Sequence, residues 1–127
     1  MRIMFVCLGN ICRSPAAQAV MQALVNERGV SGGFEIDSAG TASYHIGRGP
    51  DPRMIAAGAK RGLQFGSVAK AFSQEHATHR DLVLAMDREN LRGILAIARQ
   101  SDVPHVRLLS HYLDDSWPTD VPDPYYG

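Results

Sequence analysis

Four short apolar runs alternate with segments in which apolar residues recur at helical spacing, and this alternation restricts the possible folds more than any other feature. The apolar runs have the length of strands buried on both faces and cover residues 2–6, 34–38, 81–86 and 106–109. The helical segments extend over about residues 14–29, 51–62 and 88–99. Because the connections between them are short, we expect a parallel sheet covered by helices on both faces.

The predicted fold class is therefore α/β, with one domain over residues 1–127. We expect a four-stranded parallel sheet in the flavodoxin-like order 2-1-3-4, with ligands bound beyond the carboxyl ends of its strands. A further helix is expected to cover the sheet after the fourth strand, but the sequence stops at Gly127. The closing C-terminal helix is thus expected to be missing, with one face of the sheet left open.

Composition narrows the classes of function. Thirteen basic residues balance thirteen acidic ones, so no net field attracts nucleic acid or anionic lipid, and neither is expected as a partner. No apolar stretch approaches the roughly 20 residues needed to cross a bilayer, and the first ten residues lack the apolar core of a signal peptide. Two cysteines, Cys7 and Cys12, are too few for a secreted disulfide scaffold. A cytoplasmic protein with a reactive thiol is predicted.

The chemistry is concentrated in residues 7–14, a C-x5-R-S loop between a buried strand and a helix whose cap and start are predicted at Ser14 and Pro15. Phosphate-ester cleavage needs an ionised nucleophile, and a thiol that faces a helix N-terminus beside an arginine is readily ionised. A loop curled at a helix start directs backbone N–H groups at an anion, and Arg13 adds a fork that binds two oxygens. The loop predicts a phosphate-monoester hydrolase with Cys7 as nucleophile.

The other loop residues are expected to bind or support the phosphate; they are Leu8, Gly9, Asn10, Ile11, Cys12 and Ser14. Gly9 permits the backbone angles of the curl, and Asn10 can brace the loop from within. Ser14 can donate its hydroxyl to the Cys7 sulfur and so ease departure of the thiolate. The alternative, a small buried cysteine at a strand end, is less favoured because strand, Gly-Asn turn and Ser-Pro helix start agree with one function.

Residues 6–15, V-C-L-G-N-I-C-R-S-P, resemble the signature of the low-molecular-weight protein tyrosine phosphatases. Four further blocks resemble that family in the family's order: S-A-G-T at 38–41, P-D-P-R at 50–53, L-A-M-D at 84–87 and D-P-Y-Y-G at 123–127. The resemblance extends over the whole chain. It implies a protein tyrosine phosphatase that forms a phosphocysteine intermediate, uses no cofactor, and acts on phosphotyrosine-containing proteins as a monomer or weak dimer.

A carboxyl group must protonate the leaving oxygen and later take a proton from the attacking water. The residues alone do not choose among Asp114, Asp115, Asp120 and Asp123, and an exposed turn aspartate is the alternative for each. The resemblance implies Asp123, which stands in the D-P-Y-Y block. Apolar neighbours there can raise the pKa of a carboxyl group, so that it holds its proton.

Tyr44 and Tyr125 are the expected walls of the substrate cleft, an aromatic pair able to enclose a phenyl ring. Either could instead be a half-exposed loop tyrosine. By resemblance, Ile11 favours phosphotyrosine, because protein-arginine phosphatases carry a smaller threonine there. The resemblance also implies Cys12 as a reversible disulfide partner that protects Cys7 from irreversible oxidation, with a buried, inert Cys12 as the alternative.

One departure from the family concerns Ser67, which stands where many members have a histidine, so the hydrogen bonds beneath the loop must be built differently. The five histidines lack the spacing of metal ligands, and we expect no metal. Thioredoxin-coupled arsenate reductases share the fold and the loop, but they relay electrons through downstream cysteines, and none follows Cys12. A phosphate-binding module without turnover is a third possibility, which the presence of Asp123 disfavours.

Overall fold

The computed structural model describes residues 1–127 except 43–44, 115 and 123–127. The described strands are β1 (Arg2–Cys7), β2 (Glu35–Gly40), β3 (Leu82–Ala85) and β4 (Val106–Leu108). The described α-helices are α1 (Arg13–Glu27), α2 (Pro52–Ala59), α3 (Gln74–Thr78) and α4 (Arg88–Ile97). Short 3-10 helices are η1 (Ser31–Gly33), η2 (Gln100–His105) and η3 (Leu109–Tyr112).

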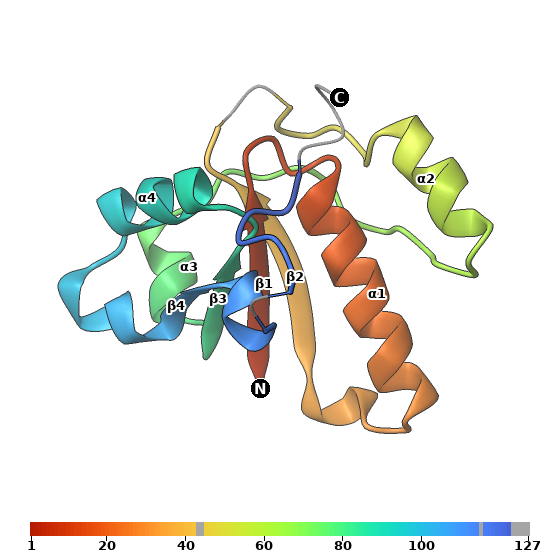
Figure 1. Cartoon of the computed structure of the whole chain (residues 1–127), viewed down its shortest axis with the longest axis horizontal. Helices are drawn as coiled ribbons and strands as arrows, with labels where there is room; N and C mark the ends of the chain where they lie inside the picture. The colour runs from red at the N-terminus through yellow and green to blue at the C-terminus, as the bar shows by residue number, and fades with distance from the viewer. Residues whose placement is uncertain (43–44, 115, 123–127) are drawn as a thin grey trace.

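The four strands form one parallel sheet in the order β2-β1-β3-β4, which confirms the predicted fold class and strand order (Figure 1). At the carboxyl end of the central strand β1, Cys7 lies opposite Gly40 of β2. The loops that lead from β1 into α1 and from β3 into α4 begin at this edge of the sheet. The predicted phosphate loop is therefore at the edge where parallel sheets bind their ligands.

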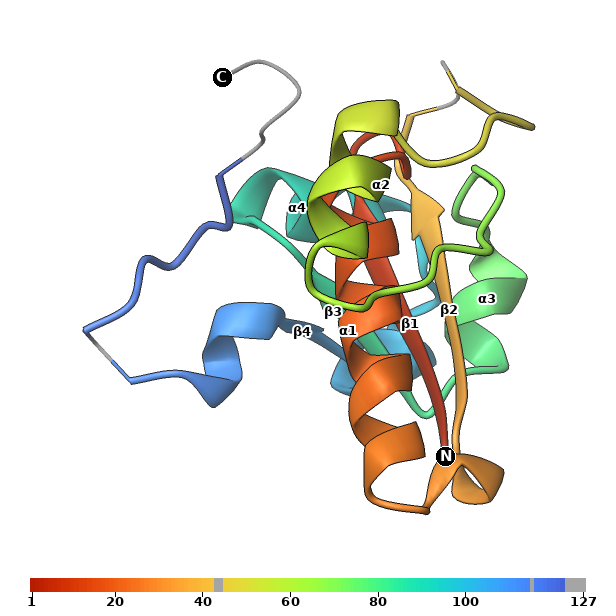
Figure 2. The same cartoon turned by 90° about the vertical axis from the view of Figure 1, so that its right-hand side faces the viewer.

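Side chains of β1 alternate between two apolar layers, as expected for a strand buried on both faces. Met4 and Val6 are fully buried in one layer, together with Ile94 of α4 and Ala77 of α3. Ile3, Phe5 and Cys7 belong to the other layer, against which Ala17 and Met21 of α1 pack. Figure 2 shows α1 and α3 on opposite sides of the sheet. On the outer surface of α1, Val20 and Leu24 are each 43% exposed.

Two helix starts are capped by aspartate side chains, and a third differs from the prediction. The Asp51 carboxylate accepts from the Arg53 main-chain N–H at 2.8 Å at the start of α2, and Asp87 accepts from Asn90 N–H at 2.6 Å at the start of α4. The prediction of Ser14 as the cap of α1 was wrong. The helix begins at Arg13, with Cys12 at the N-cap, because the Ser14 hydroxyl is engaged inside the loop. Within the described residues, no helix has the length and apolar character needed to cross a membrane.

Candidate active site

The Cys7 sulfur lies inside the loop that connects β1 to α1, with two hydrogen-bonding groups directed at it. The Asn10 main-chain N–H donates to Sγ at 3.3 Å, and the Ser14 hydroxyl oxygen lies 3.0 Å from Sγ. The Ser14 oxygen accepts a hydrogen bond from Asn10 Nδ2 at 2.7 Å, so the hydroxyl proton is available for donation. Of its two possible acceptors, the Cys7 sulfur at 3.0 Å is nearer than the Ala39 carbonyl oxygen at 3.4 Å. Two hydrogen-bond donors are thus directed at the sulfur.

Asn10 holds the loop in its curled conformation. It has φ +58°, a left-handed angle that asparagine tolerates better than most residues, and it is the one non-glycine residue with positive φ in the described part of the chain. Its side-chain oxygen accepts from the Lys70 main-chain N–H at 3.0 Å. The Lys70 carbonyl in turn accepts from Gly40 N–H at 2.8 Å. Asn10 thus ties the loop both to Ser14 and to a segment 60 residues away in sequence.

The end of β2 packs directly against the loop. The Thr41 N–H donates to the Cys7 carbonyl at 2.9 Å, and the Ala42 N–H donates to the Leu8 carbonyl at 2.9 Å. A Cβ atom at Gly40 would lie 2.7 Å from the Leu8 carbonyl oxygen, so this close approach requires glycine. The main chain of the loop is therefore held from outside as well as by its own side chains.

Arg13 is held from the other side of the loop. Its side chain is only 4% exposed, and Nη1 donates to Asp87 Oδ2 at 2.6 Å and to the Val121 carbonyl at 2.9 Å. Asp87 therefore binds Arg13 and caps α4 with its two carboxylate oxygens. The contact of Asp87 with Arg13 was not predicted from the sequence. The position of Asp87 just after β3, at the same edge of the sheet as Arg13, was the available signal for the second contact.

Two separate groups of polar contacts involve neighbouring residues of β2. The Ser38 hydroxyl donates to Gln18 Oε1 at 2.6 Å, and Asp37 binds both the Lys70 ammonium, at 2.9 Å, and the Arg80 guanidinium. The loop is thus braced through the main chain of Lys70. Ser67, at the position of the family histidine, lines a separate hollow beside α1.

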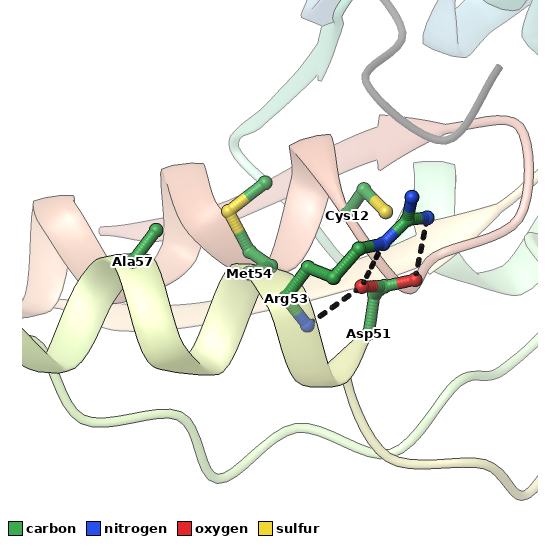
Figure 3. Close-up of a pocket in the computed structure, with 5 residues that line it drawn as sticks. All are labelled: Cys12, Asp51, Arg53, Met54 and Ala57. Carbon is green, nitrogen blue, oxygen red and sulfur yellow. Dashed lines mark hydrogen bonds and ion pairs between the residues drawn. The ribbon is translucent and has the colours of Figure 1, made fainter. Parts of the chain in front are cut away.

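Cys12 borders a pocket between the loop and α2. The pocket has a volume of about 190 Å³ and is lined by Cys12, Asp51, Arg53, Met54 and Ala57 (Figure 3). Arg53 binds Asp51 through two side-chain hydrogen bonds of 3.1 Å, and these bonds hold the pKa of the Asp51 carboxyl below its ordinary value. Cys7 and Cys12 are both buried, at 3% and 5% exposed.

The structure brings the predicted loop residues together and leaves three predicted residues undescribed. Asp123, Tyr44 and Tyr125 lie outside the described residues. Described residues near them border the loop. The His45 ring lies so close to Gly9 that a Cβ atom at Gly9 would be 2.8 Å from the ring. The Val121 N–H donates to the Met86 carbonyl, and the Val121 carbonyl accepts from Arg13. Among the described residues, no group of three or more histidine, cysteine, aspartate or glutamate side chains could hold a metal.

A parallel α/β fold with a thiol and a buried arginine in one loop, at the carboxyl edge of the sheet, is suited to bind and cleave a phosphate ester. The family model described as "Low molecular weight phosphotyrosine protein phosphatase" matches residues 2–127. The chain belongs to this family. This confirms the resemblance inferred from the sequence and the predicted enzyme class, phosphoric monoester hydrolase.

Individual relatives support the same assignment. The low molecular weight protein-tyrosine-phosphatase of Streptomyces coelicolor is 44% identical over 99% of this chain and 79% of its own length. YfkJ of Bacillus subtilis, a low molecular weight protein-tyrosine-phosphatase, is 38% identical over 98% of this chain and 80% of the YfkJ sequence. The crystal structure of YfkJ matches with a TM-score of 0.95 over 99% of this chain and 80% of the YfkJ chain. The crystal structure of DARP, a Drosophila arginine phosphatase, matches with a TM-score of 0.92 at 30% identity over 99% of this chain and 82% of that one.

Proposed function

We propose that this chain hydrolyses phosphotyrosine monoesters in proteins through a phosphocysteine intermediate. The observation that supports this most directly is the contact set of the Cys7 sulfur, which receives the Asn10 N–H and lies 3.0 Å from the Ser14 hydroxyl. A sulfur held between two donors, in a loop that also contains a buried arginine, is arranged as a nucleophile.

In the first step, the Cys7 thiolate attacks the phosphorus, the S–P bond forms and the bond to the tyrosine oxygen breaks. Asp123 gives its proton to the departing phenolate. Main-chain N–H groups of Leu8, Gly9, Ile11 and Cys12 bind the phosphoryl oxygens together with the Arg13 guanidinium. Because Asp87 and the Val121 carbonyl engage Nη1, Arg13 is oriented before substrate arrives, which reduces the reorganisation that the transition state requires.

In the second step, a water molecule attacks the phosphocysteine, Asp123 takes its proton and the S–P bond breaks. The leaving thiolate then regains its two hydrogen-bond donors. The Ser14 hydroxyl is suited to this role because Asn10 already fills its acceptor site, so that its proton points toward the sulfur. The step releases inorganic phosphate and restores the free thiolate.

The proposed substrate is a phosphotyrosine-containing protein, met in the cytoplasm by a monomer or weak dimer. Tyr44 and Tyr125 are proposed to enclose the phenyl ring, and buried Ile11 to favour it over phosphoarginine. That discrimination needs a test, because one structural relative is described as an arginine phosphatase. We also retain Cys12 as the redox partner of Cys7, since both thiols are buried in the same short loop.

The direct test is hydrolysis of p-nitrophenyl phosphate and of a phosphotyrosine peptide by purified protein in the presence of a chelator. We expect turnover of both and complete loss in Cys7→Ser. Vanadate binding without turnover would overturn the hydrolase and favour a phosphate-binding module. Thioredoxin-dependent reduction of arsenate would favour the reductase alternative.

The acid assignment is tested with aryl phosphates of increasing leaving-group pKa. Asp123→Ala is expected to lower kcat by about 10² to 10⁴ for poor leaving groups and much less for good ones. Asp114→Ala is the matched control, because the Asp114 carboxylate is engaged by the Ser116 main-chain N–H in an exposed turn. An equal loss across all leaving groups would contradict general acid catalysis by Asp123.

A further inference from the structure

The pocket between the phosphate loop and α2 is not used by the proposed chemistry. Its volume of about 190 Å³ exceeds that of an apolar cavity of about 150 Å³ that accepts benzene. Cys12 contributes from the loop, and Met54 and Ala57 project from one face of α2 into the same space (Figure 3). The pocket is thus large enough for one hydrophobic amino-acid side chain.

The lining of the pocket selects for an apolar group. Cys12, Met54 and Ala57 present sulfur and methyl groups, which behave as apolar surface. The two charged groups, Asp51 and Arg53, bind each other, so that their charges are compensated at one end of the pocket. A charged ligand group would enter this space without a counter-charge, whereas an aliphatic group would lose only contact with water.

The pocket is attached to the phosphate loop and not merely near it. Cys12 precedes Arg13 in the loop, and the Asp51 N–H donates to the Ile11 carbonyl at 2.7 Å, which joins the start of α2 to the same loop. Successive residues of a peptide are only about 3.8 Å apart at their Cα atoms. Because Cys12 belongs both to the loop and to the wall of the pocket, residues next to a phosphotyrosine bound in the loop are within reach of the pocket.

We propose that this pocket is a substrate subsite that binds the aliphatic side chain of a residue next to the phosphotyrosine. The proposal rests on the proposed function of the loop. It assigns Met54 and Ala57 as residues that determine specificity. One methylene group more or less in a hydrophobic pocket changes kcat/KM by about 10-fold to 200-fold, so the subsite should distinguish leucine from glycine by at least about tenfold.

The test compares three phosphotyrosine peptides, one with glycine on both sides and two with leucine on one side or the other. We expect one leucine peptide to exceed the glycine peptide by about tenfold in kcat/KM. In Ala57→Leu the new side chain occupies the pocket, and the ratio should fall to about one. Ala56→Leu is the matched control, because Ala56 is exposed on α2 and does not line the pocket; its ratio should stay near that of the natural chain.

Rates are normalised to each variant's own rate with p-nitrophenyl phosphate, and folding is checked by circular dichroism. Hydrolysis of p-nitrophenyl phosphate without any preference for leucine would overturn the subsite and leave the phosphatase intact. A preference that survives in Ala57→Leu would also overturn it. If the natural chain hydrolyses none of the substrates, calorimetric titration with the same peptides decides, because equal affinities would contradict the subsite independently of turnover.

Discussion

The phosphate loop and the segment of residues 109–122 border the same edge of the sheet, yet they are held in different ways. In the loop, the polar side chains are buried: Asn10 is 1% exposed and Ser14 is fully buried. In the segment, large apolar side chains lie on the surface, with Tyr112 54% and Trp117 62% exposed. The loop is therefore part of the core, while the described residues of the segment lie mostly on the surface.

Leu109 packs against the core at the start of the segment, and polar contacts hold the segment near its end. The Val121 N–H donates to the Met86 carbonyl at 2.9 Å, and Asp120 binds Arg88. The two regions meet at Arg13, whose guanidinium donates hydrogen bonds to the Asp87 carboxylate and to the Val121 carbonyl. The comparison shows that the proposed binding of phosphate rests on a preorganised region, whereas the proposed proton donor, Asp123, follows a lightly anchored one.

Among substitutions that test this difference, Asp87→Asn is expected to have the largest effect on stability and activity. Asparagine still caps α4 but no longer compensates Arg13, and removing one partner of a buried ion pair costs about 3 to 5 kcal/mol of unfolding free energy. The Arg13 side chain would also lose its orientation, so kcat/KM should fall about 100-fold. Urea unfolding and the kinetics of p-nitrophenyl phosphate measure the two effects.

Asp102→Asn is the control for Asp87→Asn. Asp102 is 8% exposed and accepts from the Thr78 hydroxyl at 2.7 Å in η2, before β4 and away from the loop. It should lower stability without a matching loss of kcat/KM. If Asp87→Asn also lowers stability alone, the Asp87 contact does not orient Arg13 for catalysis.

A smaller effect is expected from Asn10→Ala, which removes the hydrogen bonds to Ser14 and Lys70 and places alanine at φ +58°. Together these losses amount to about 3 kcal/mol of unfolding free energy. Asn10→Gly removes the same hydrogen bonds but tolerates the angle, so it should recover about 1 kcal/mol. Equal stabilities of the two variants would show that the backbone angle is not strained.

Asp37→Asn should have a still smaller effect, and one that depends on pH. Burial raises the pKa of Asp37, but hydrogen bonds from Arg80 and Lys70 more than offset burial and hold the pKa below its ordinary value. The ionised carboxylate therefore stabilises the fold above the unfolded-state pKa of about 3.9, and this contribution is lost as pH falls through the lower folded-state pKa.

We expect Asp37→Asn to lower the unfolding free energy by about 1 to 2 kcal/mol at pH 7, with a narrowing difference from the natural chain below about pH 4. Urea unfolding between pH 3 and 7 measures this. Glu35→Gln, in an exposed pair with Arg2, is the control and should show no comparable narrowing. A constant difference at all pH values would mean that Asp37 acts through packing and not through its charge.

The features that could be predicted from the sequence are those encoded in neighbouring residues. The buried strands, their order and the loop at residues 7–14 follow from short patterns and from the residues that punctuate them. The helix α3 was missed because five residues are too few to show helical periodicity. The cap of α1 was assigned to Ser14 because the local pattern contains no sign that the hydroxyl is needed by Cys7 and Asn10.

Contacts between distant residues account for what the sequence could not provide. Asp87 lies 74 residues from Arg13, and Lys70 lies 60 residues from Asn10, so neither contact leaves a mark on local spacing. The roles of Asp123, Tyr44 and Tyr125 came from family resemblance and stay predictions, since these residues are outside the described part of the chain. Resemblance identifies residue types in order, but it does not supply their geometry.

The smallest effect is expected from Asp120→Asn, which tests the anchor of the surface segment. The Arg88 and Asp120 side chains are 64% and 40% exposed, and hydrogen bonds from Arg88 hold the pKa of Asp120 below its ordinary value. Asparagine can still accept the Arg88 main-chain N–H, which donates to Oδ1 at 2.9 Å, and salt screens the lost charge. The urea midpoint should therefore not change measurably at physiological ionic strength, and kcat should change by less than about twofold.

A fall in the urea midpoint as large as that of Asp87→Asn would mean that the segment is as much a part of the cooperative core as the loop. A large fall in kcat with an unchanged urea midpoint would mean that the segment contributes to catalysis but not to stability. It would show that the ion pair positions the chain that leads to Asp123, although it adds nothing to folding. In that case the difference in kcat between Asp120→Asn and the natural chain should shrink as salt is added, because ions screen this exposed pair far more than they screen the buried pair of Arg13 and Asp87.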